Sequence, residues 1–384
     1  SSHWLTAMWI QSLSLTDIRS YEQLDCPFSQ GITAFVGRNG QGKTNIVEAI
    51  GYLATLSSHR VASDLPLIRQ GSERGFIRAS VSSSDRDVLL ELAITPGKAN
   101  KARINKSPVP RTRDILGIVR AVVFAPEDLE LVKGDPSARR RFLDELLVQR
   151  TPRLAGTRAD YDRVLKQRNA LLKSASIARK AGTDRIVQTL EVWDEQLASH
   201  GGELIAARIS LLNELMPLAQ QQYAMVSGSD TDMVLNAMYQ SSLGEDAVLS
   251  TDREEWAAQL LTTINVRRKD ELDRGVTLVG PHRDDVALHL GDFPAKGYVS
   301  HGESWSLALS LRLGAFDLLT ADGESPILIL DDVFAELDAQ RRAHLATHVG
   351  TAQQAFITAA VAEDVPAELA GTRIEVVKGG VIHG

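Results

Sequence analysis

The stretch ITAFVGRNGQGKT, residues 32–44, decides how the rest of this chain folds. It opens with ITAFV, a short apolar run of the kind found in buried strands. The remainder, GRNGQGKT, matches the pattern G-x-x-x-x-G-K-[ST], and residues 45–56 continue with apolar side chains at helical spacing. We therefore predict a strand, a glycine-rich loop and a helix in direct succession.

This succession suits the binding of a triphosphate better than a chance glycine-rich turn. Glycines let the backbone wrap closely around phosphates, and the helix that follows presents free N–H groups and the positive end of its dipole. Lys43 is placed to reach the β- and γ-phosphates, and the Thr44 hydroxyl is placed to ligate Mg²⁺. The predicted ATP-binding residues are Gly37, Arg38, Asn39, Gly40, Gln41, Gly42, Lys43 and Thr44.

A second apolar run ends in two carboxylates. Residues 327–330 read ILIL, and Asp331 and Asp332 follow directly. Open α/β sheets bind ligands at the carboxyl ends of their parallel strands. We therefore predict that Asp331 holds Mg²⁺ and that Asp332 positions or activates an attacking water. The alternative is a strand that ends in an exposed acidic turn.

The stretch from Ser300 to Glu303 precedes an apolar helix predicted over residues 305–319. A helix N-terminus that carries a serine hydroxyl and the free N–H of a glycine, here Gly302, can bind phosphate. The same residues suit simple capping, in which Ser300 and Glu303 form a capping box. The two roles are compatible.

Together, these three features resemble the ABC-type ATPases. In that class the serine element contacts the γ-phosphate held by an opposite copy, so that ATP binding drives dimerisation. The resemblance implies that Ser300, Gly302 and Glu303 reach the ATP of a second copy. It also implies that Asp338, within residues 335–338, belongs to the D-loop at the dimer interface, and it makes Thr358 the candidate for a polar switch residue.

Three further stretches resemble the RecF family within that class. They are residues 40–50, GQGKTNIVEAI; residues 124–144, which contain FAPEDL and RRRFLD; and residues 280–285, GPHRDD. The resemblance covers essentially the whole chain from Met8. The sequence departs from the family at His301, Glu303 and the neighbouring Trp305.

This resemblance implies an ATP- and DNA-binding protein of recombinational repair and replication restart. Such proteins act at single-strand gaps, work with RecR and RecO to load RecA, and support the SOS response. Many ABC-type relatives carry Glu where this chain has Asp332, and the shorter side chain suggests slow hydrolysis. We therefore expect a weak DNA-stimulated ATPase that uses hydrolysis as a switch.

The composition is that of a soluble globular protein. Of 384 residues, 43% are hydrophobic and 24% charged. No stretch approaches the roughly 20 apolar residues of a membrane span, and the N-terminus lacks the features of a signal peptide. Cys26 is the only cysteine, which excludes an internal disulfide and fits a reducing compartment. We expect a cytoplasmic protein.

The pattern along the chain predicts an α/β fold, an ABC-type P-loop ATPase head with a mixed sheet and an inserted α-helical subdomain. The head is predicted over residues 8–130 and 275–384, because β-type patterns dominate both ends. The insert, residues 131–274, is charged and helix-prone, with breaks expected at residues 151–152 and 181–183 and a strand at residues 233–238. Its longest helix is expected to reach about 40 residues, or roughly 60 Å.

A DNA partner is not visible in the net charge of −7. Two basic segments, around residues 101–106 and 139–141, are candidates for sequence-independent contact with the phosphates of duplex, single-stranded or junction DNA. The alternative is that both segments are charged faces exposed to solvent. Arg60 could contact DNA or phosphate, or pair with Asp64. The DNA-binding candidates are Arg60, Lys101, Arg103, Lys106, Arg139, Arg140 and Arg141.

Two other protein classes share these motifs. A structural clamp of the SMC or Rad50 kind requires long runs of heptads, and residues 131–274 hold none that is sustained. A transporter ATPase subunit would pair with a membrane permease, and both the insert and residues 280–285 are foreign to that class.

Overall fold

The computed structural model describes residues 8–83, 86–180, 187–228 and 233–383. These residues form two compact units, which we describe separately. Unit 1 comprises the described residues of Ser1–Val132, Pro217–Val234 and Val299–Gly384, and unit 2 those of Lys133–Met216 and Leu235–Tyr298.

These borders differ from the predicted division into a head and an insert. Residues 275–298 fall in unit 2, because strand β10 (Asp285–Leu290) pairs with β9 (Leu235–Gln240). Residues 217–234 fall in unit 1, although they lie within the predicted insert. The sequence could not show either association, because both depend on contacts between distant segments.

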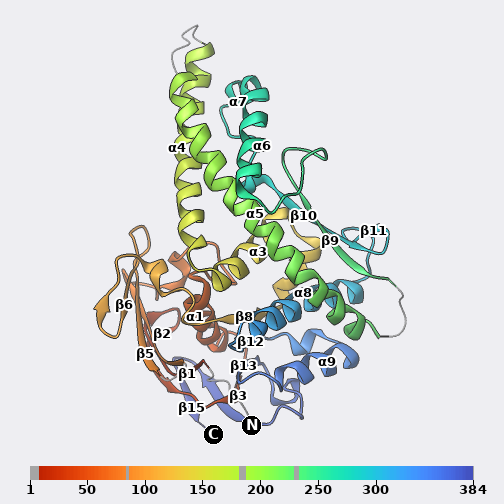
Figure 1. Ribbon diagram of the computed structural model, residues 1–384. Helices are drawn as coiled ribbons and strands as arrows, with labels where there is room; N and C mark the ends of the chain where they lie inside the picture. Colours follow the sequence, from red (N-terminus) through yellow and green to blue (C-terminus); the bar gives the residue numbers. More distant parts are fainter. Residues whose placement is uncertain (1–7, 84–85, 181–186, 229–232, 384) are drawn as a thin grey trace. The chain divides into compact units, whose positions relative to one another are not determined.

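Unit 1 contains a six-stranded, mostly parallel sheet (Figure 1). Strand β15 (Gly380–His383) is antiparallel to its neighbour β14, and the other adjacent pairs are parallel. The two strands β12 and β13 are buried along their whole length, which explains the apolar run of β12 and the mainly apolar sequence of β13. After β15 the strand order is β14 (Thr372–Val377), β3 (Gly31–Val36), β13 (Gln354–Ala359), β12 (Ile327–Asp331) and β8 (Ala121–Phe124).

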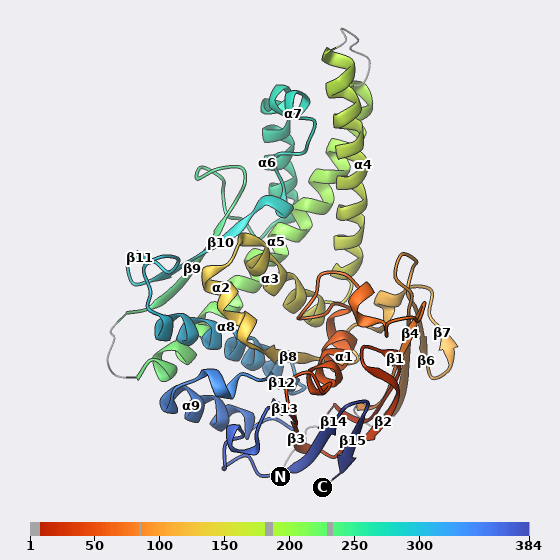
Figure 2. The ribbon, with the colours of Figure 1, turned by 180° about the vertical axis from the view of Figure 1, so that it is seen from behind.

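A second sheet in unit 1 is antiparallel (Figure 2). Buried and less buried residues alternate along its strands, as expected for a sheet with one face on the core. Helix α1 (Lys43–Thr55) contributes to one hydrophobic cluster with side chains of both sheets, so it forms the centre of the unit. The strand order is β2 (Tyr21–Pro27), β1 (Trp9–Ile18), β4 (Gly75–Ser83), β5 (Arg86–Ile94), β6 (Lys101–Ile104) and β7 (Ser107–Pro108).

Two more helices complete unit 1, α8 (His301–Ala321) and α9 (Ala339–Val349). The apolar helix predicted over residues 305–319 corresponds to α8, which buries most of its side chains. Short helical turns connect the larger elements: η1 (Leu65–Leu67), η2 (Thr112–Ile115), η3 (Pro126–Leu129), α2 (Glu130–Lys133), η6 (Phe334–Glu336) and η7 (Ala362–Asp364).

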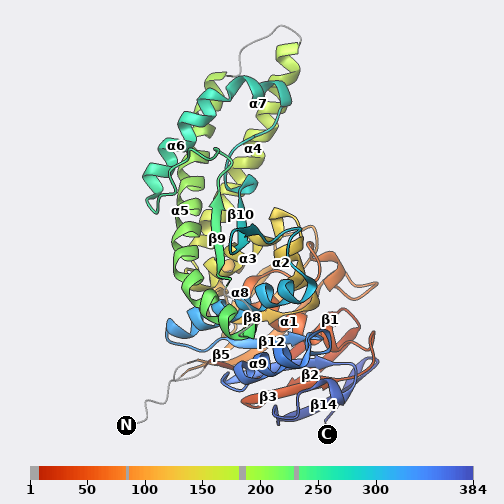
Figure 3. The same cartoon turned by 90° about the vertical axis from the view of Figure 1, so that its right-hand side faces the viewer.

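Unit 2 is mainly helical (Figure 3). Helix α5 (Val187–Val226) is the longest, with 40 residues, which confirms the expected length, and it continues past Pro217 into unit 1. Its other helices are α3 (Pro136–Arg150), α4 (Leu154–Lys180), α6 (Arg253–Val266) and α7 (Arg268–Arg274), with the turn η5 (Pro281–Arg283). A small sheet is ordered β11 (Phe293–Pro294), β10, β9.

The predicted break at residues 151–152 is confirmed by the gap between α3 and α4. The predicted break at residues 181–183 lies outside the described residues. The strand expected at residues 233–238 is β9, which is displaced to residues 235–240. Among the described residues, no helix is long and apolar enough to span a membrane.

A buried ionic cluster joins three helices of unit 2. Arg168 on α4 is fully buried and donates to Asp194 on α5 at 2.9 Å, to Glu271 on α7 at 2.8 and 3.0 Å, and to the Thr277 hydroxyl at 2.9 Å. Burial opposes the charged form of Arg168, but its two carboxylate partners raise its pKa. The pairing compensates the loss of hydration that burial imposes.

We predict that Arg168→Met lowers the free energy of unfolding by about 3–5 kcal/mol, because it leaves the buried Glu271 carboxylate without its cation. Asp194 keeps its second partner, Arg268. The control is Arg163→Met on the same helix. Arg163 makes a 3.4 Å pair with Asp160, and its side chain is 62% exposed, so the expected loss is below about 1 kcal/mol. Urea unfolding followed by circular dichroism measures both, and equal losses would contradict the role assigned to the cluster.

Candidate functional site

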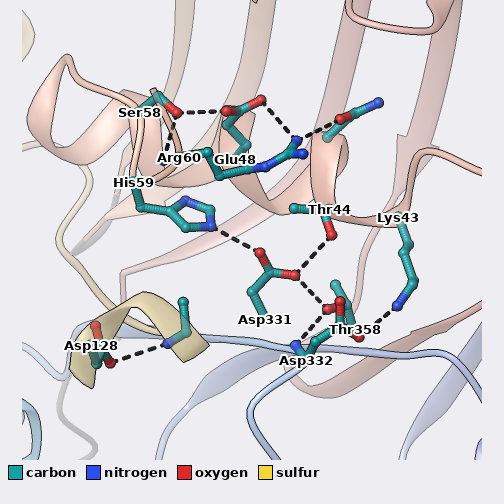
Figure 4. A network of polar contacts seen from close by, with 12 residues as sticks. Lys43, Thr44, Glu48, Ser58, His59, Arg60, Asp128, Asp331, Asp332 and Thr358 are labelled. Carbon is teal, nitrogen blue, oxygen red and sulfur yellow. Dashed lines mark hydrogen bonds and ion pairs between the residues drawn. The ribbon is translucent and has the colours of Figure 1, made fainter. Parts of the chain in front are cut away.

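Three parallel strands of unit 1 end at the same edge of the sheet. The register places Asp331 of β12 beside Thr358 of β13, and Thr358 beside Phe35 of β3. The glycine-rich loop leaves β3 at this edge and leads into α1. The loop and the two aspartates, which lie almost 300 residues apart in the sequence, therefore meet as predicted (Figure 4).

Backbone conformation explains the glycines of the loop. Gly40 and Gly42 have φ angles of 87° and 104°, which other residues rarely adopt. A Cβ on Gly42 would also lie 2.7 Å from the Tyr21 hydroxyl, and one on Gly37 would lie 2.5 Å from the Val376 carbonyl oxygen. No carboxylate lies in the first turn of α1, so the positive end of the helix dipole stays available to an anion.

The loop borders a hollow of about 270 Å³. Its lining combines backbone of the loop, the start of α1 and side chains of both charges. Lys43 is almost fully buried, whereas Arg38, Asn39 and Gly40 are exposed. The lining residues are Asn39, Gly40, Gly42, Lys43, Thr44, Asn45, Arg60 and Asp332.

Asp331 is buried and accepts hydrogen bonds from three side chains. The Thr44 hydroxyl lies 3.0 Å and the Thr358 hydroxyl 2.7 Å from Oδ1, and His59 Nε2 lies 2.9 Å from Oδ2 (Figure 4). Burial alone would raise the pKa of this carboxyl group, but the contacts with His59, Thr358 and Thr44 bring it below the usual value. Asp331 is therefore an anion at neutral pH.

Asp332 faces the other side of the site. Its φ of 55° lies in the left-handed region, and its amide N–H donates to the Thr358 hydroxyl at 3.0 Å. This conformation brings the Asp332 carboxylate to 2.5 Å from Lys43 Nζ. Burial raises the pKa of Asp332, and the charge of Lys43 opposes that rise. Non-glycine residues in this backbone region are typical of functional sites.

The oxygen ligands fit a magnesium ion that is shared with a phosphate chain. Asp331 Oδ1 and Thr44 Oγ1 are hard donors 3.0 Å apart, of the type that Mg²⁺ prefers. Among the described residues, no three His, Cys, Asp or Glu side chains gather closely enough to hold a metal. A cation here would thus need further oxygens from phosphate or water, which is how Mg²⁺ binds beside nucleotides.

Sequence reasoning missed two residues of the site, Glu48 of α1 and His59 in the segment that follows α1. Glu48 is buried, and its carboxylate accepts from the Ser58 hydroxyl at 2.5 Å and from Arg19 at 2.9 Å. These bonds hold the turn that places His59 on Asp331. The sequence offered one signal for Glu48, a carboxylate on an otherwise apolar stretch of α1. Nothing in the local sequence indicates that His59 contacts Asp331.

Arg60 lies at the rim of the hollow, and the suggested pair with Asp64 is wrong. Arg60 instead donates to the Asn45 side chain at 3.0 Å and lies 3.8 Å from the Glu48 carboxylate. Asp64 accepts from the Tyr52 hydroxyl and from Asn100, both at 3.0 Å. Arg60 is thus placed beside a phosphate site, and its contact with DNA remains a prediction.

The residues expected to reach a second copy lie at two helix starts. Ser300 is exposed and caps α8: its hydroxyl accepts from the Glu303 N–H at 3.1 Å, and Glu303 accepts from the Ser300 N–H at 2.9 Å. The predicted capping box is therefore confirmed. Asp338 caps α9, accepting from the Arg341 N–H at 2.9 Å. The exposed position of Ser300 leaves it accessible to a second copy.

Among the predicted DNA contacts, the arginines of α3 differ in exposure. Arg139 is buried and bonded to Asp285 at 2.8 and 3.3 Å, so the prediction that it contacts DNA is wrong: its charge is compensated inside unit 2. Arg140 donates to the Asp284 carbonyl at 2.9 Å, and Arg141 pairs with Glu145 at 2.7 Å.

The basic residues of unit 1 are more accessible. Lys101, Arg103 and Lys106 are exposed on β6 and the turn that follows it. Cross-strand pairing places Arg103 beside Glu91, and the two side chains form a 3.2 Å ion pair. The Arg103 side chain nevertheless remains half exposed.

Residues 9–381 match the family model described as RecF/RecN/SMC N terminal domain. A DNA replication and repair protein RecF of Frankia alni is 54% identical, with 98% of this chain and 100% of that protein covered. Its counterpart in Streptomyces avermitilis is 55% identical, with coverage of 97% and 99%.

A solved structure is similar over the full length of both chains. It is described as the recombination mediator protein RecF with ATP in the RecFOR pathway, with 27% identity, 100% coverage of each chain and a TM-score of 0.89. The chain therefore belongs to the RecF family, within the wider RecF/RecN/SMC group. This confirms the predicted α/β fold of the ABC-type ATPase head.

We predict that Lys43→Met weakens nucleotide binding roughly 10- to 100-fold, because charge-assisted hydrogen bonds to phosphate are lost. Titration calorimetry with ATP and Mg²⁺ measures the affinity. The control is Lys106→Met, which removes the same charge from an exposed position outside the hollow and should leave the affinity unchanged. Wild-type affinity in the Lys43 variant would remove this lysine from the site.

Proposed function

We propose that this protein is an ATP-dependent DNA-binding protein of recombinational DNA repair and replication restart. It would act at single-strand gaps and junctions between single- and double-stranded DNA, help to load a recombinase and support the SOS response. The observation that carries the proposal is the meeting of Lys43, Thr44, Asp331 and Asp332 at one sheet edge. The family membership gives this site its biological setting.

In this proposal ATP binds with its phosphates in the glycine-rich loop. Mg²⁺ is held by Thr44 and Asp331, whose oxygens already face each other. The phosphates compete with Asp332 for the ammonium of Lys43, since both are anions and the cation is almost fully buried. Binding would therefore free the Asp332 carboxylate to orient water, which couples nucleotide binding to the formation of the catalytic group.

The second half of the ATP site comes from another copy of the chain. Ser300, Gly302 and Glu303 stand at the exposed start of α8, where the Ser300 hydroxyl and backbone N–H groups can bind a phosphate. The Glu303 carboxylate lies in the same turn and reduces the attraction of the helix dipole for an anion. Asp338 of the D-loop would lie at the same interface. Hydrolysis is expected to be slow, because Asp332 is one methylene shorter than the Glu of many relatives. It would serve as a DNA-stimulated switch that releases the dimer.

DNA is proposed to contact Arg60, Lys101, Arg103 and Lys106 through its phosphates. Arg140 and Arg141 remain weaker candidates, because both have protein partners. The proposed protein partners are RecR and RecO, which the RecFOR pathway named for the similar solved structure supports. RecA is proposed as an indirect partner on the family resemblance alone. The proposed location is the cytoplasm.

We predict that Ser300→Arg preserves ATP binding by one copy and prevents the dimer. The arginine would project from an exposed helix start, where it cannot disturb the core, into the space meant for a second copy's nucleotide. Sedimentation velocity with and without ATP and Mg²⁺ measures the change. The control is Ser137→Arg, an exposed position in the first turn of α3, which should dimerise normally. A nucleotide-driven dimer of the Ser300 variant would remove Ser300 from the trans role.

For DNA, we predict that Lys101→Ala combined with Arg103→Ala lowers affinity similarly for all sequences. The slope of log affinity against log salt concentration should fall by about 2, because each lost phosphate contact removes about one released counterion. Gel shifts of gapped, single-stranded and duplex DNA, with ATP, provide the slopes. The control combines Arg253→Ala with Lys269→Ala in unit 2, and an equal fall there would indicate only a change in net charge.

A further inference from the structure

Gln222 lies in the last turns of α5, within unit 1, and its side chain is only 3% exposed. A buried amide is costly unless each of its polar atoms has a partner. Gln222 meets this condition with partners on two other helices, α8 and α9. The residues before and after it on α5 also touch these helices. Gly314 of α8 approaches the backbone of Ala219, and Gln340 of α9 donates to the Val226 carbonyl.

The amide of Gln222 connects three side chains. Its Nε2 donates to Asp317 Oδ2 of α8 at 2.7 Å and lies 2.9 Å from His348 Nε2 of α9. Its Oε1 lies 3.0 Å from His344 Nε2, also of α9. The three contacts are consistent when His348 accepts and His344 donates. No shorter or apolar side chain could satisfy an acceptor on one helix and two imidazoles on the other.

The two helices joined by Gln222 begin at the two elements that are proposed to reach the nucleotide of a second copy. Helix α8 begins after Ser300, and α9 begins after Asp338. At 1.5 Å per residue, Gln222 acts about 25 Å along α8 from Ser300 and about 9 to 15 Å along α9 from Asp338. Because both helices are continuous, a change in their relative position at Gln222 would move both starts.

A second contact between α8 and α9 lies near those starts. Arg341 Nε donates to the Ser306 hydroxyl at 2.8 Å, and Arg341 also pairs with Asp338. A Cβ on Gly302 would approach the Arg341 guanidinium to 3.0 Å, so the small residue allows this approach. The helix pair is thus held at two levels. At the level of Gln222, one side chain of α5 bonds to both helices, whereas near the starts α5 contacts α9 through the Val226 carbonyl and Gln340.

We propose that Gln222 is a positioning residue for the trans half of the ATP site: it holds α8 and α9 in the register that presents Ser300 and Asp338 together to a second copy's nucleotide. This inference rests on the proposed function, because it requires the ATP-dependent dimer. It assigns no contact between Gln222 and the nucleotide. The expected signature is therefore a weaker dimer at unchanged ATP affinity.

The first test compares Gln222→Leu with Gln221→Leu. Leucine has a similar volume but makes none of the three polar contacts, whereas Gln221 is the exposed neighbour on the same helix. Sedimentation equilibrium with ATP and Mg²⁺ gives the dimer dissociation constant, and titration calorimetry at concentrations below dimerisation gives the ATP affinity. We expect about a tenfold weaker dimer for the Gln222 variant alone, with ATP affinity unchanged within about twofold.

A merely structural role would give a different result. If Gln222→Leu destabilises the fold, ATP affinity and melting temperature fall together with dimerisation. Gln222→Asn then replaces it, because it keeps an amide in the site but is too short to reach all three partners. Combining Gln222→Glu with Asp317→Asn exchanges carboxylate and amide between the two positions. That exchange restores a bond between α5 and α8, and it should recover dimerisation relative to Gln222→Glu alone.

The outcomes separate this inference from the proposal on which it rests. If wild-type protein stays monomeric with ATP and Mg²⁺, the shared-site function fails and the role of Gln222 fails with it. If wild type dimerises and the folded Gln222 variants dimerise equally well, only the role of Gln222 is overturned. The same conclusion follows if Gln221→Leu weakens the dimer to the same extent, or if the exchanged pair gives no recovery.

Discussion

The carboxylate of Asp331 is the point on which the ATP site depends. It ends a fully buried strand, so its charge must be compensated by hydrogen bonds from the protein. Three segments supply them: Thr44 at the start of α1, His59 in the turn after α1, and Thr358 on the neighbouring strand. The requirement to satisfy one buried anion therefore fixes the distances between the glycine-rich loop, β13 and the end of β12.

The parts of this site that could be predicted are those with a local signal. The glycine-rich loop is recognisable because φ and close packing restrict its residues, and β12 because a strand buried on both faces must be apolar. His59 carries no such signal, and Glu48 shows only a carboxylate on an apolar stretch of α1, since the roles of both arise from tertiary contacts. The charge pattern also gave a wrong prediction for Arg139. In the sequence Arg139 looks like a surface cation, but Asp285, far along the chain, binds it inside unit 2.

The stretches that mark the family outside the ATP site have a structural explanation in unit 2. Arg208 is buried, bonds Asp144 at 2.7 and 2.8 Å, and donates to the Tyr239 hydroxyl and the Pro281 carbonyl. Tyr239 in turn donates to Asp284 at 2.6 Å. One network thus joins residues 139–144 to residues 280–285. Removing any partner would leave a buried charge unsatisfied, which is a sufficient reason for these residue types without any contact to ligand.

The two halves of the proposed ATP site depend on different kinds of structural element. The half that holds the phosphates lies on strands whose register is set by backbone hydrogen bonds, and its polar groups are bonded to one another. The half that we propose for contact with a second copy lies on helix starts, where the capping box satisfies Ser300 locally and the surface stays exposed. Strand register leaves little freedom, whereas packed helices can shift by small amounts. A conformational switch driven by ATP should therefore reside in the helices α8 and α9, while the phosphate-binding edge of the sheet stays fixed.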